Sequence, residues 1–305
     1  MLLIREEETR EVLSVARAAE IIEATYRGIA RGVIAASQPS LMRITGEPYR
    51  LGAKGAVLHH LGVAGVRLLS RAAPRLMLWS LLTGEPIALI DESYAYRLRT
   101  GVSAAVCARF LLRQPSASRV TIIGAGSIAH EVAVAIHSLL TPYEIVVVAR
   151  SASSAEQFAL GTAKADVTVI PKTDVSEAVR NADLVITITS ANEVLVRRDD
   201  LKTDAAVLSM GGGLEVDYAV WAAAECRFVD DLDYAVHQGD VAAWIAAGQD
   251  DIQGIQASVT GTIAALADGT VGDPRQRAGL AMAIVQGTTA LDVALAHAVY
   301  NQRVG

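Results

Sequence analysis

Several residue types that define particular protein classes are scarce in this chain of 305 residues. Its two cysteines, Cys107 and Cys226, lie far apart and cannot by themselves supply a disulfide framework or a thiolate metal site. Acidic side chains outnumber basic ones, 33 to 27, so no global positive field is available to hold a phosphate backbone. We therefore expect no nucleic-acid partner.

Long apolar runs are missing as well, and we expect no targeting segment. The N-terminus is charged by its fifth residue, which excludes a secretory signal. The longest apolar stretches contain Gly, Arg or His and stay short of the ~18 clean residues of a membrane span. Hydrophobic residues nevertheless make up 52% of the chain, enough for a large core. These features predict a soluble, reduced, cytoplasmic protein without a membrane partner.

Lysine is the scarcest charged residue. Only four of the 27 basic residues are lysines, at positions 54, 164, 172 and 202, and the rest are arginines. A GC-rich genome is sufficient to explain this bias. It still leaves Lys54 as the only amine outside residues 119–204, and so the only one that the N-terminal part offers for proton transfer or imine chemistry. An ordinary surface lysine is the alternative.

The N-terminal part has the pattern of a mixed or antiparallel sheet flanked by helices. Residues 8–35 and 94–113 have helical periodicity. Between them, short β-branched or Leu-rich runs alternate with Gly, Pro and polar breaks, and two of these runs are joined by a tight turn at 83–86.

From Arg119 onward, strands alternate with helices at the spacing of a parallel, doubly wound sheet. Two more helices are expected at 256–270 and 278–300. The fold class is therefore α/β, with a doubly wound Rossmann domain and a smaller α/β domain. The expected boundaries are 117–281 for the first and 1–116 with 282–305 for the second.

A glycine-rich turn opens this second region. Gly124-Ala125-Gly126-Ser127-Ile128-Ala129 follows the apolar strand 120–123 and begins a helix, as a dinucleotide-binding turn requires. Gly124 permits the tight turn, Gly126 lets the backbone approach a pyrophosphate, and Ala129 keeps the helix close to the strand. The N–H groups of the helix N-terminus favour an anion.

The end of the next strand indicates which dinucleotide binds. An NAD site usually has Asp or Glu there for the ribose 2′-OH, but this chain has Ala149-Arg150-Ser151 and no acid before Glu156. A guanidinium with hydroxyls suits a 2′-phosphate, which favours NADP, unless Arg150 is a solvated loop residue.

Arginines in apolar stretches of the N-terminal part suggest a bound anion. Arg43, Arg67 and Arg99 lie there together with Lys54. Each arginine taken singly fits an internal salt bridge, whereas the group is better explained by a carboxylate substrate.

No metal site is expected. His59 and His60 are adjacent and so point in different directions, and no further ligand spacing accompanies them. The acids at 230–233 follow a strand and are typical of a helix N-terminus.

Seven stretches, in order along the chain, resemble the ornithine cyclodeaminase/μ-crystallin family. The resemblance is made specific by YRLRTGVSAAVCARFLL at 96–112, VTIIGAGSIA at 120–129 and the closing GTTALDVALAHAVY at 287–300. The others are LMRITG at 41–46, GVAGVRLLS at 62–70, TGEPIALID at 83–91 and ADLVITITS at 182–190.

The resemblance implies a homodimer whose subunits combine a substrate-binding and dimerisation domain with a Rossmann domain. Family members include ornithine and lysine cyclodeaminases, alanine dehydrogenases, and ketimine and pyrroline-2-carboxylate reductases. Arg43 and Arg99 would bind the substrate carboxylate. The cofactor-binding set would be Thr100, Gly124, Gly126, Ser127, Ile128, Ala129, Arg150, Ser151, Thr189 and Ser190.

Two departures from the family pattern concern catalysis. The family's lysine falls on Arg67, and Lys54 lies close to another family lysine, so Lys54 and Arg67 are the catalytic candidates. The aspartate that cyclodeaminases use falls near Gly213, where Glu215 and Asp217 are the nearest acids, although a helix start explains both equally well. A simple reductase tolerates these departures better than a cyclodeaminase, because it needs only a dinucleotide, a carboxylate clamp and one proton donor.

We therefore expect an NADP-dependent oxidoreductase, with NAD as the alternative cofactor. It would act on CH–NH or CH–NH2 groups of a small 2-imino or 2-oxo carboxylate, as an imino-acid reductase or amino-acid dehydrogenase. Two alternatives stay open: a cyclodeaminase that releases ammonia and recycles NAD, and a non-catalytic, crystallin-like protein that binds NADPH.

Overall fold

The computed structural model describes residues 1–305 except 38–40, 47–48 and 70–73. It divides into two compact units, residues 1–100 with 287–305, and residues 101–286. The first boundary falls inside helix α3 (Ser93–Leu111). From Gly101 onward this helix packs within the second unit, where a Cβ on Gly101 would lie 2.4 Å from the carbonyl oxygen of Glu131. The structure thus assigns 101–116 and 282–286, expected in the smaller domain, to the second unit.

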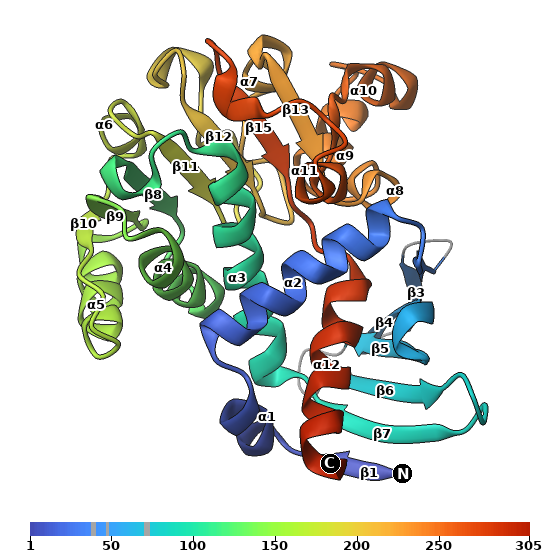
Figure 1. Cartoon of the computed structure of the whole chain (residues 1–305). Coiled ribbons are helices and arrows are strands. Elements are labelled where there is room, and N and C mark those ends of the chain that lie inside the picture. Colours follow the sequence, from blue (N-terminus) through green and yellow to red (C-terminus); the bar gives the residue numbers. More distant parts are fainter. Residues whose placement is uncertain (38–40, 47–48, 70–73) are drawn as a thin grey trace. The chain divides into compact units, whose positions relative to one another are not determined.

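The first unit is a largely antiparallel sheet with helices packed on it. Helix α12 (Thr289–Val304) packs against α2 (Val15–Ala30) and against strands β4 (Tyr49–Leu58) and β5 (Val63–Leu69) (Figure 1). Among the described strands, only β1 and β7 pair in parallel. The strand order is β1 (Leu2–Ile4), β7 (Pro86–Asp91), β6 (Arg75–Ser80), β5 (Val63–Leu69), β4 (Tyr49–Leu58) and β2 (Ile34–Ala36), with β3 (Met42–Gly46) also paired to β4.

The expected helix over 8–35 is two helices and a strand. Helix α1 (Glu6–Val12) ends at an extended Leu13, and α2 begins where the Ser14 hydroxyl accepts a hydrogen bond from the Arg17 N–H. After α2, Gly32 adopts φ +69°, and the chain then enters β2. Helical periodicity therefore predicts the helices, but the cap at Ser14 and the positive φ of Gly32 divide the segment. The tight turn at 83–86 does join two antiparallel strands, β6 and β7.

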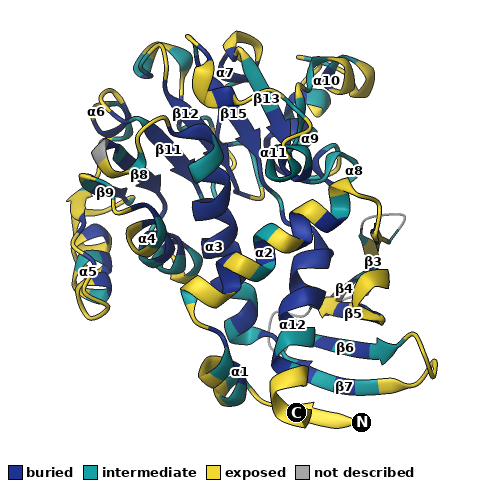
Figure 2. Ribbon diagram, viewed as in Figure 1, coloured by how far each residue is buried: buried dark blue, intermediate teal, exposed yellow. Residues whose placement is uncertain are grey.

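The second unit is the expected doubly wound Rossmann fold. Its strands are parallel, and those at the centre of the sheet are buried on both faces (Figure 2). Their order is β10 (Ile170–Lys172), β9 (Glu144–Val148), β8 (Arg119–Ile123), β11 (Leu184–Thr187), β12 (Ala206–Ser209), β15 (Ala281–Ile284), β13 (Cys226–Val229) and β14 (Gly261–Thr262). The helices are α4 (Ser127–Leu140), α5 (Ala152–Ala163), α6 (Val175–Val179), α7 (Tyr218–Ala223), α8 (Leu232–Ala235), α9 (Gly239–Ala246), α10 (Ile252–Ser258) and α11 (Ile263–Asp268).

Two helix predictions in this region were wrong in part. The expected helix 278–300 begins only at Thr289, because 281–284 forms the central strand β15 between β12 and β13. An apolar run such as Ala-Met-Ala-Ile has no periodicity that separates a buried strand from a buried helix. The expected helix 256–270 is interrupted by β14 at 261–262, after which the Thr262 hydroxyl caps α11.

The described residues form no helix with the length and apolar character needed to cross a bilayer.

Candidate functional site

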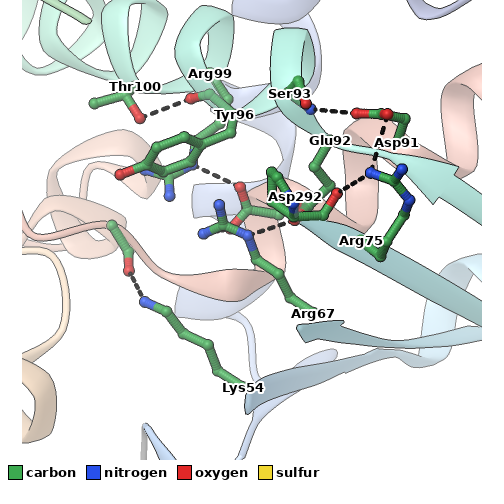
Figure 3. Close-up of polar contacts among 12 residues, drawn as sticks. Lys54, Arg67, Arg75, Asp91, Glu92, Ser93, Tyr96, Arg99, Thr100 and Asp292 are labelled. Atoms are coloured by element: carbon green, nitrogen blue, oxygen red, sulfur yellow. Dashed lines mark hydrogen bonds and ion pairs between the residues drawn. The ribbon is translucent and has the colours of Figure 1, made fainter. Parts of the chain in front are cut away.

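The first unit buries a network of ion pairs between arginines and carboxylates (Figure 3). Arg67 Nε lies 2.6 Å from Glu92 Oε2, and Arg67 Nη1 lies 3.6 Å from Asp292 Oδ2. Arg99 Nε donates to Asp292 Oδ1 at 2.7 Å. All four residues are at most 4% exposed. Asp292 therefore links the two guanidinium groups.

Different elements of the first unit supply these groups. Arg67 lies on β5, where strand alternation turns it to the buried face, and Glu92 lies between β7 and α3. Arg99 is on α3, and Asp292 is in the first turn of α12, a favourable position for an acid. The guanidinium carbons of Arg67 and Arg99 lie 4.3 and 5.0 Å from the centroid of the Tyr96 ring, within the range of cation–π contacts.

Lys54 reaches the same region from the neighbouring strand. It is paired with Arg67 across β4 and β5 and is 6% exposed. Its Nζ donates to the carbonyl oxygen of Gly287 at 3.1 Å. Gly287 has φ +90°, and a Cβ there would lie 2.4 Å from Arg99 Nη1. Only glycine therefore allows Lys54 and Arg99 to approach this backbone together.

The network has more cations than acids. Among the described residues, three cations (Lys54, Arg67 and Arg99) meet two carboxyl groups, those of Glu92 and Asp292. Burial acts to raise the pKa of Asp292, but Arg67 and Arg99 outweigh it and lower that pKa below 3.8. Burial raises the pKa of Glu92 to about 7, with Arg67 opposing the rise and Asp292 adding to it. A small anion would balance the excess charge.

Two other predicted residues of this unit are placed differently. Arg43 is exposed on β3, opposite Gly52 of β4. It therefore lacks the burial that singles out Arg99 as a candidate anion contact. The hydroxyl of Thr100 donates to the carbonyl oxygen of Tyr96 at 2.8 Å, a bond internal to α3.

Sequence reasoning missed Glu92, Tyr96 and Asp292. Asp292 had a usable signal, because it is a single acid in the apolar stretch TALDVALA, and a buried acid requires a partner. The sequence contains no comparable signal for Glu92 and Tyr96, since nothing in their local sequence indicates that they contact Arg67.

The glycine turn of the second unit has the geometry of an anion site. Gly124 adopts φ +126°, Gly126 is the N-cap of α4, and no side chain caps the N-terminus of this helix. A Cβ on Gly126 would meet nothing within 4 Å, and Ser127 is exposed while Ala129 is buried against the sheet. Space is therefore open beside Gly126 at the uncapped N-terminus of this helix, where a pyrophosphate could bind. Ile128, the other predicted residue, is partly buried.

Arg150 and Ser151 follow β9 and are exposed. The Ser151 hydroxyl accepts from the Ser154 N–H at 3.2 Å and so caps α5. This arrangement leaves the Arg150 guanidinium at the carboxyl end of β9, the strand next to β8.

Thr189 and Ser190 follow β11, on the other side of β8. Thr189 is held by Glu215, whose Oε1 accepts from the Thr189 N–H at 2.8 Å and from the Thr189 hydroxyl. Of the two acids near Gly213, only Asp217 is at a helix start, where it caps α7. Glu215 is completely buried and is committed to Thr189.

The described residues contain no group of three or more His, Cys, Asp or Glu side chains arranged to hold a metal ion. His59 and His60 form an exposed 3-10 turn, and Asp231 caps α8.

The fold and these sites define a two-unit α/β protein with a Rossmann unit. Residues 64–305 match the ornithine cyclodeaminase/mu-crystallin family, and the chain belongs to it. The resemblance recognised in the sequence is thereby confirmed. An alanine dehydrogenase of Archaeoglobus fulgidus is 25% identical over 98% of this chain and 94% of its own length. A Δ1-pyrroline-2-carboxylate reductase of Bacillus cereus is 34% identical over 38% of this chain and 35% of its own.

Solved structures share the fold over the whole chain. The Δ1-pyrroline-2-carboxylate reductase of Thermococcus litoralis, in complex with NADH and L-proline, has a TM-score of 0.89 at 18% identity and covers 100% of this chain and 98% of its own. An archaeal alanine dehydrogenase dimer with bound NAD has a TM-score of 0.88 at 23% identity, with the same coverage.

Proposed function

We propose that this protein is an NADP-dependent oxidoreductase that acts on a small 2-imino or 2-oxo carboxylate, as an imino-acid reductase or amino-acid dehydrogenase. The observation that carries the proposal is the buried network of the first unit, in which two arginines and a lysine meet two carboxyl groups among the described residues. The open glycine turn of the second unit supports a dinucleotide. Relatives that are named as alanine dehydrogenase and pyrroline-2-carboxylate reductase agree with this chemistry.

In this reading the arginines bind and orient the carboxylate. Arg99 is fixed by Asp292 and Tyr96, so its guanidinium is already ordered when an anion arrives, and Arg43 is the second candidate contact. The excess charge matches one carboxylate. Both carboxyl groups of the network already hold guanidinium groups, so they offer little to the second ammonium of a diamino acid. This disfavours a cyclodeaminase.

Lys54 is the proposed proton donor, since its ammonium can protonate the nitrogen or oxygen of the substrate double bond. Arg67 cannot replace it, because a guanidinium keeps its proton at working pH, and its role is therefore electrostatic. The bound dihydronicotinamide would supply the hydride. Gly124, Gly126 and the first turn of α4 would hold the pyrophosphate.

A substrate screen tests the proposal. Cyclic imino acids, and 2-oxo acids with amines, would be incubated with NADPH or NADH while nicotinamide absorbance is followed. Consumption of NADPH by an imino or oxo acid is expected. Ammonia release from a diamino acid without a net absorbance change would instead establish a cyclodeaminase, and NADPH binding without turnover would establish a non-catalytic protein.

Replacing Arg150 with alanine should remove most of the preference for NADPH over NADH. A charge-assisted contact of this kind contributes about 1.5–3 kcal/mol, or roughly a 10- to 150-fold difference in Kd. Titration calorimetry with NADPH and with NADH measures this difference in Kd. The exposed Arg180 at the end of α6 provides the control, since Arg180→Ala should change neither Kd. Equal Kd values for both nucleotides in the unmutated protein would contradict the assignment.

The second face of the first-unit sheet supports a homodimer. Val66 and Leu68 of β5 are 37% and 46% exposed, and Leu51 of β4 is 45% exposed. The partly exposed apolar residues Met77 and Leu89 lie on the neighbouring strands. Because large apolar patches usually mark interfaces, we expect a second copy of the chain to cover this face. Light scattering should give about twice the 32.1 kDa of one chain, and a mass near 32.1 kDa would refute the dimer.

The affinity for substrate should fall as the pH rises through about 7. Above this pH Glu92, whose pKa burial raises to about 7, becomes a carboxylate that competes with the substrate for the positive charge of the network. KM should therefore rise across this window in the unmutated protein and stay flat in Glu92→Gln. Since the folded state binds the extra proton between pH 4.5 and about 7, the free energy of unfolding should also fall as pH rises through that range. A KM that is independent of pH in both proteins would contradict this role.

A further inference from the structure

Glu215 is a buried acid with no role in the reaction proposed above. It follows the Gly211–Gly213 loop after β12 and is completely buried. Its Oε1 accepts hydrogen bonds from both the backbone N–H and the hydroxyl of Thr189. The Thr189 hydroxyl in turn accepts from the Ala191 N–H at 2.8 Å. Glu215 therefore fixes the chain directly after β11.

A second buried acid lies beside it. Asp240, at the N-terminus of α9, accepts from the backbone N–H groups of Glu215 and Val216 at 2.6 and 2.9 Å, and from the Ser209 hydroxyl at 2.6 Å. Burial raises the pKa of both acids; at Glu215 hydrogen bonds from Thr189 and Thr187 oppose this rise, and Asp240 adds to it.

The Glu215 carboxyl also occupies space that a side chain would need. A Cβ on Gly211 would lie 1.8 Å from Glu215 Oε2, so the carboxyl packs directly on the backbone of this loop. On the other side, a Cβ on Gly124 would lie 2.4 Å from the carbonyl oxygen of Ile188, the residue before Thr189. Glu215 thus holds a segment that touches both the loop after β12 and the dinucleotide turn.

The sheet order indicates which half of a dinucleotide this segment faces. The glycine turn follows β8, and Arg150 follows β9 on one side of it, while Thr189 and Glu215 follow β11 and β12 on the other. In doubly wound folds a dinucleotide crosses this switch point, with one nucleotide on each side. With Arg150 at the adenosine phosphate, the nicotinamide half belongs on the side of Thr189.

We propose that Glu215 is a positioning residue that holds residues 188–191 in the conformation that receives the nicotinamide half of the cofactor. The inference rests on the proposed function. Glu215 is not a proton donor to the substrate, because both Thr189 donors occupy its Oε1 and no part of it reaches solvent. Its contribution is to keep Thr189 and the adjacent Ser190 in place.

Comparing two ligands that share the adenosine half of the cofactor distinguishes a positioning role of Glu215 from a general effect on protein stability. NADPH contains the nicotinamide, whereas 2′-phospho-ADP-ribose has the same adenosine half without it. In Glu215→Ala, calorimetry should show the Kd for NADPH raised about 10-fold, as expected when buried donors lose their acceptor, and the Kd for 2′-phospho-ADP-ribose nearly unchanged. Glu215→Gln should bind both ligands normally, because the amide oxygen accepts the same two bonds. Asp217→Ala, at an acid two residues along that caps α7 and pairs with Arg197, is the matched control and should change neither value.

Three results would overturn the role of Glu215 alone: unchanged binding of NADPH by Glu215→Ala, equal weakening of both ligands, or a Glu215→Gln protein as weak as Glu215→Ala. If Glu215→Ala does not fold, Thr189→Ala removes the hydroxyl from the other end of the same bond and should weaken only NADPH. Absence of binding for both ligands in the unmutated protein would overturn the proposed function together with this inference.

Discussion

Replacing Lys54 with alanine is expected to lower kcat by roughly 10²–10⁴-fold while the Kd for NADPH changes little. This range is the usual contribution of a general acid. Lys54 is the only lysine in the first unit, it is 6% exposed, and it lies opposite Arg67 on the neighbouring strand. Steady-state kinetics on a substrate from the screen, with nucleotide titration alongside, measures both quantities.

Matched variants separate proton transfer from charge. Lys54→Arg keeps the positive charge, but a guanidinium does not release its proton at working pH. Its kcat should therefore fall nearly as far as that of Lys54→Ala. Arg99→Ala should raise KM as well as lower kcat, because it removes a contact that the substrate makes before and during the reaction. Lys202→Ala, which breaks an ion pair with Asp183 in the second unit, should leave kcat unchanged.

Full turnover by Lys54→Ala would show that another group, such as a water or the Tyr96 hydroxyl, donates the proton. Full turnover by Lys54→Arg alone would show that Lys54 acts through its charge. The two outcomes lead to different chemistry at the same position.

The second unit could be predicted from sequence because its signals are local. A buried parallel strand, a glycine turn and a helix follow one another within residues 120–140, and each has its own pattern. Thr189 could be placed only through the family resemblance, since its hydrogen bond to Glu215 joins residues 26 apart. The strand at 281–284 could not be predicted, because alanine and methionine have no strong intrinsic preference for strands. The segment is a strand because it pairs with β12 and β13 in the sheet.

The sequence predicts the cations of the first-unit network but not their acidic partners. Charged side chains stand out in apolar stretches, so the sequence alone points to Lys54, Arg67 and Arg99. Their acidic partners come from the end of a strand and from the last helix, and Arg99 and Asp292 are 193 residues apart. Pairing at such a separation depends on the fold, and no periodicity encodes it. The fold therefore also determines how many of the positive charges are left for a substrate.

Replacing Asp292 with asparagine is expected to lower the free energy of unfolding by about 3–5 kcal/mol. Asparagine keeps the shape of the side chain, so the change removes charge rather than volume. The buried guanidinium groups of Arg67 and Arg99 would lose their shared carboxylate, and a buried charge without its partner is strongly destabilising. Urea unfolding of both proteins measures the difference. For comparison, Glu177→Gln breaks an exposed ion pair with Lys172 and should change stability by about 0.2–1 kcal/mol.

The pH dependence of this difference distinguishes charge from packing. Because the pKa of Asp292 is held below 3.8 in the folded protein, its stabilisation is fully present above the unfolded value of 3.8 and is lost as pH falls through the folded pKa. The unmutated protein and Asp292→Asn should therefore converge in stability at acid pH and stay apart near neutrality. A gap that stays constant down to acid pH would mean that asparagine disturbs packing. A gap below about 1 kcal/mol at neutral pH, the range of an exposed pair, would mean that Asp292 does not hold the two arginines as the structure indicates.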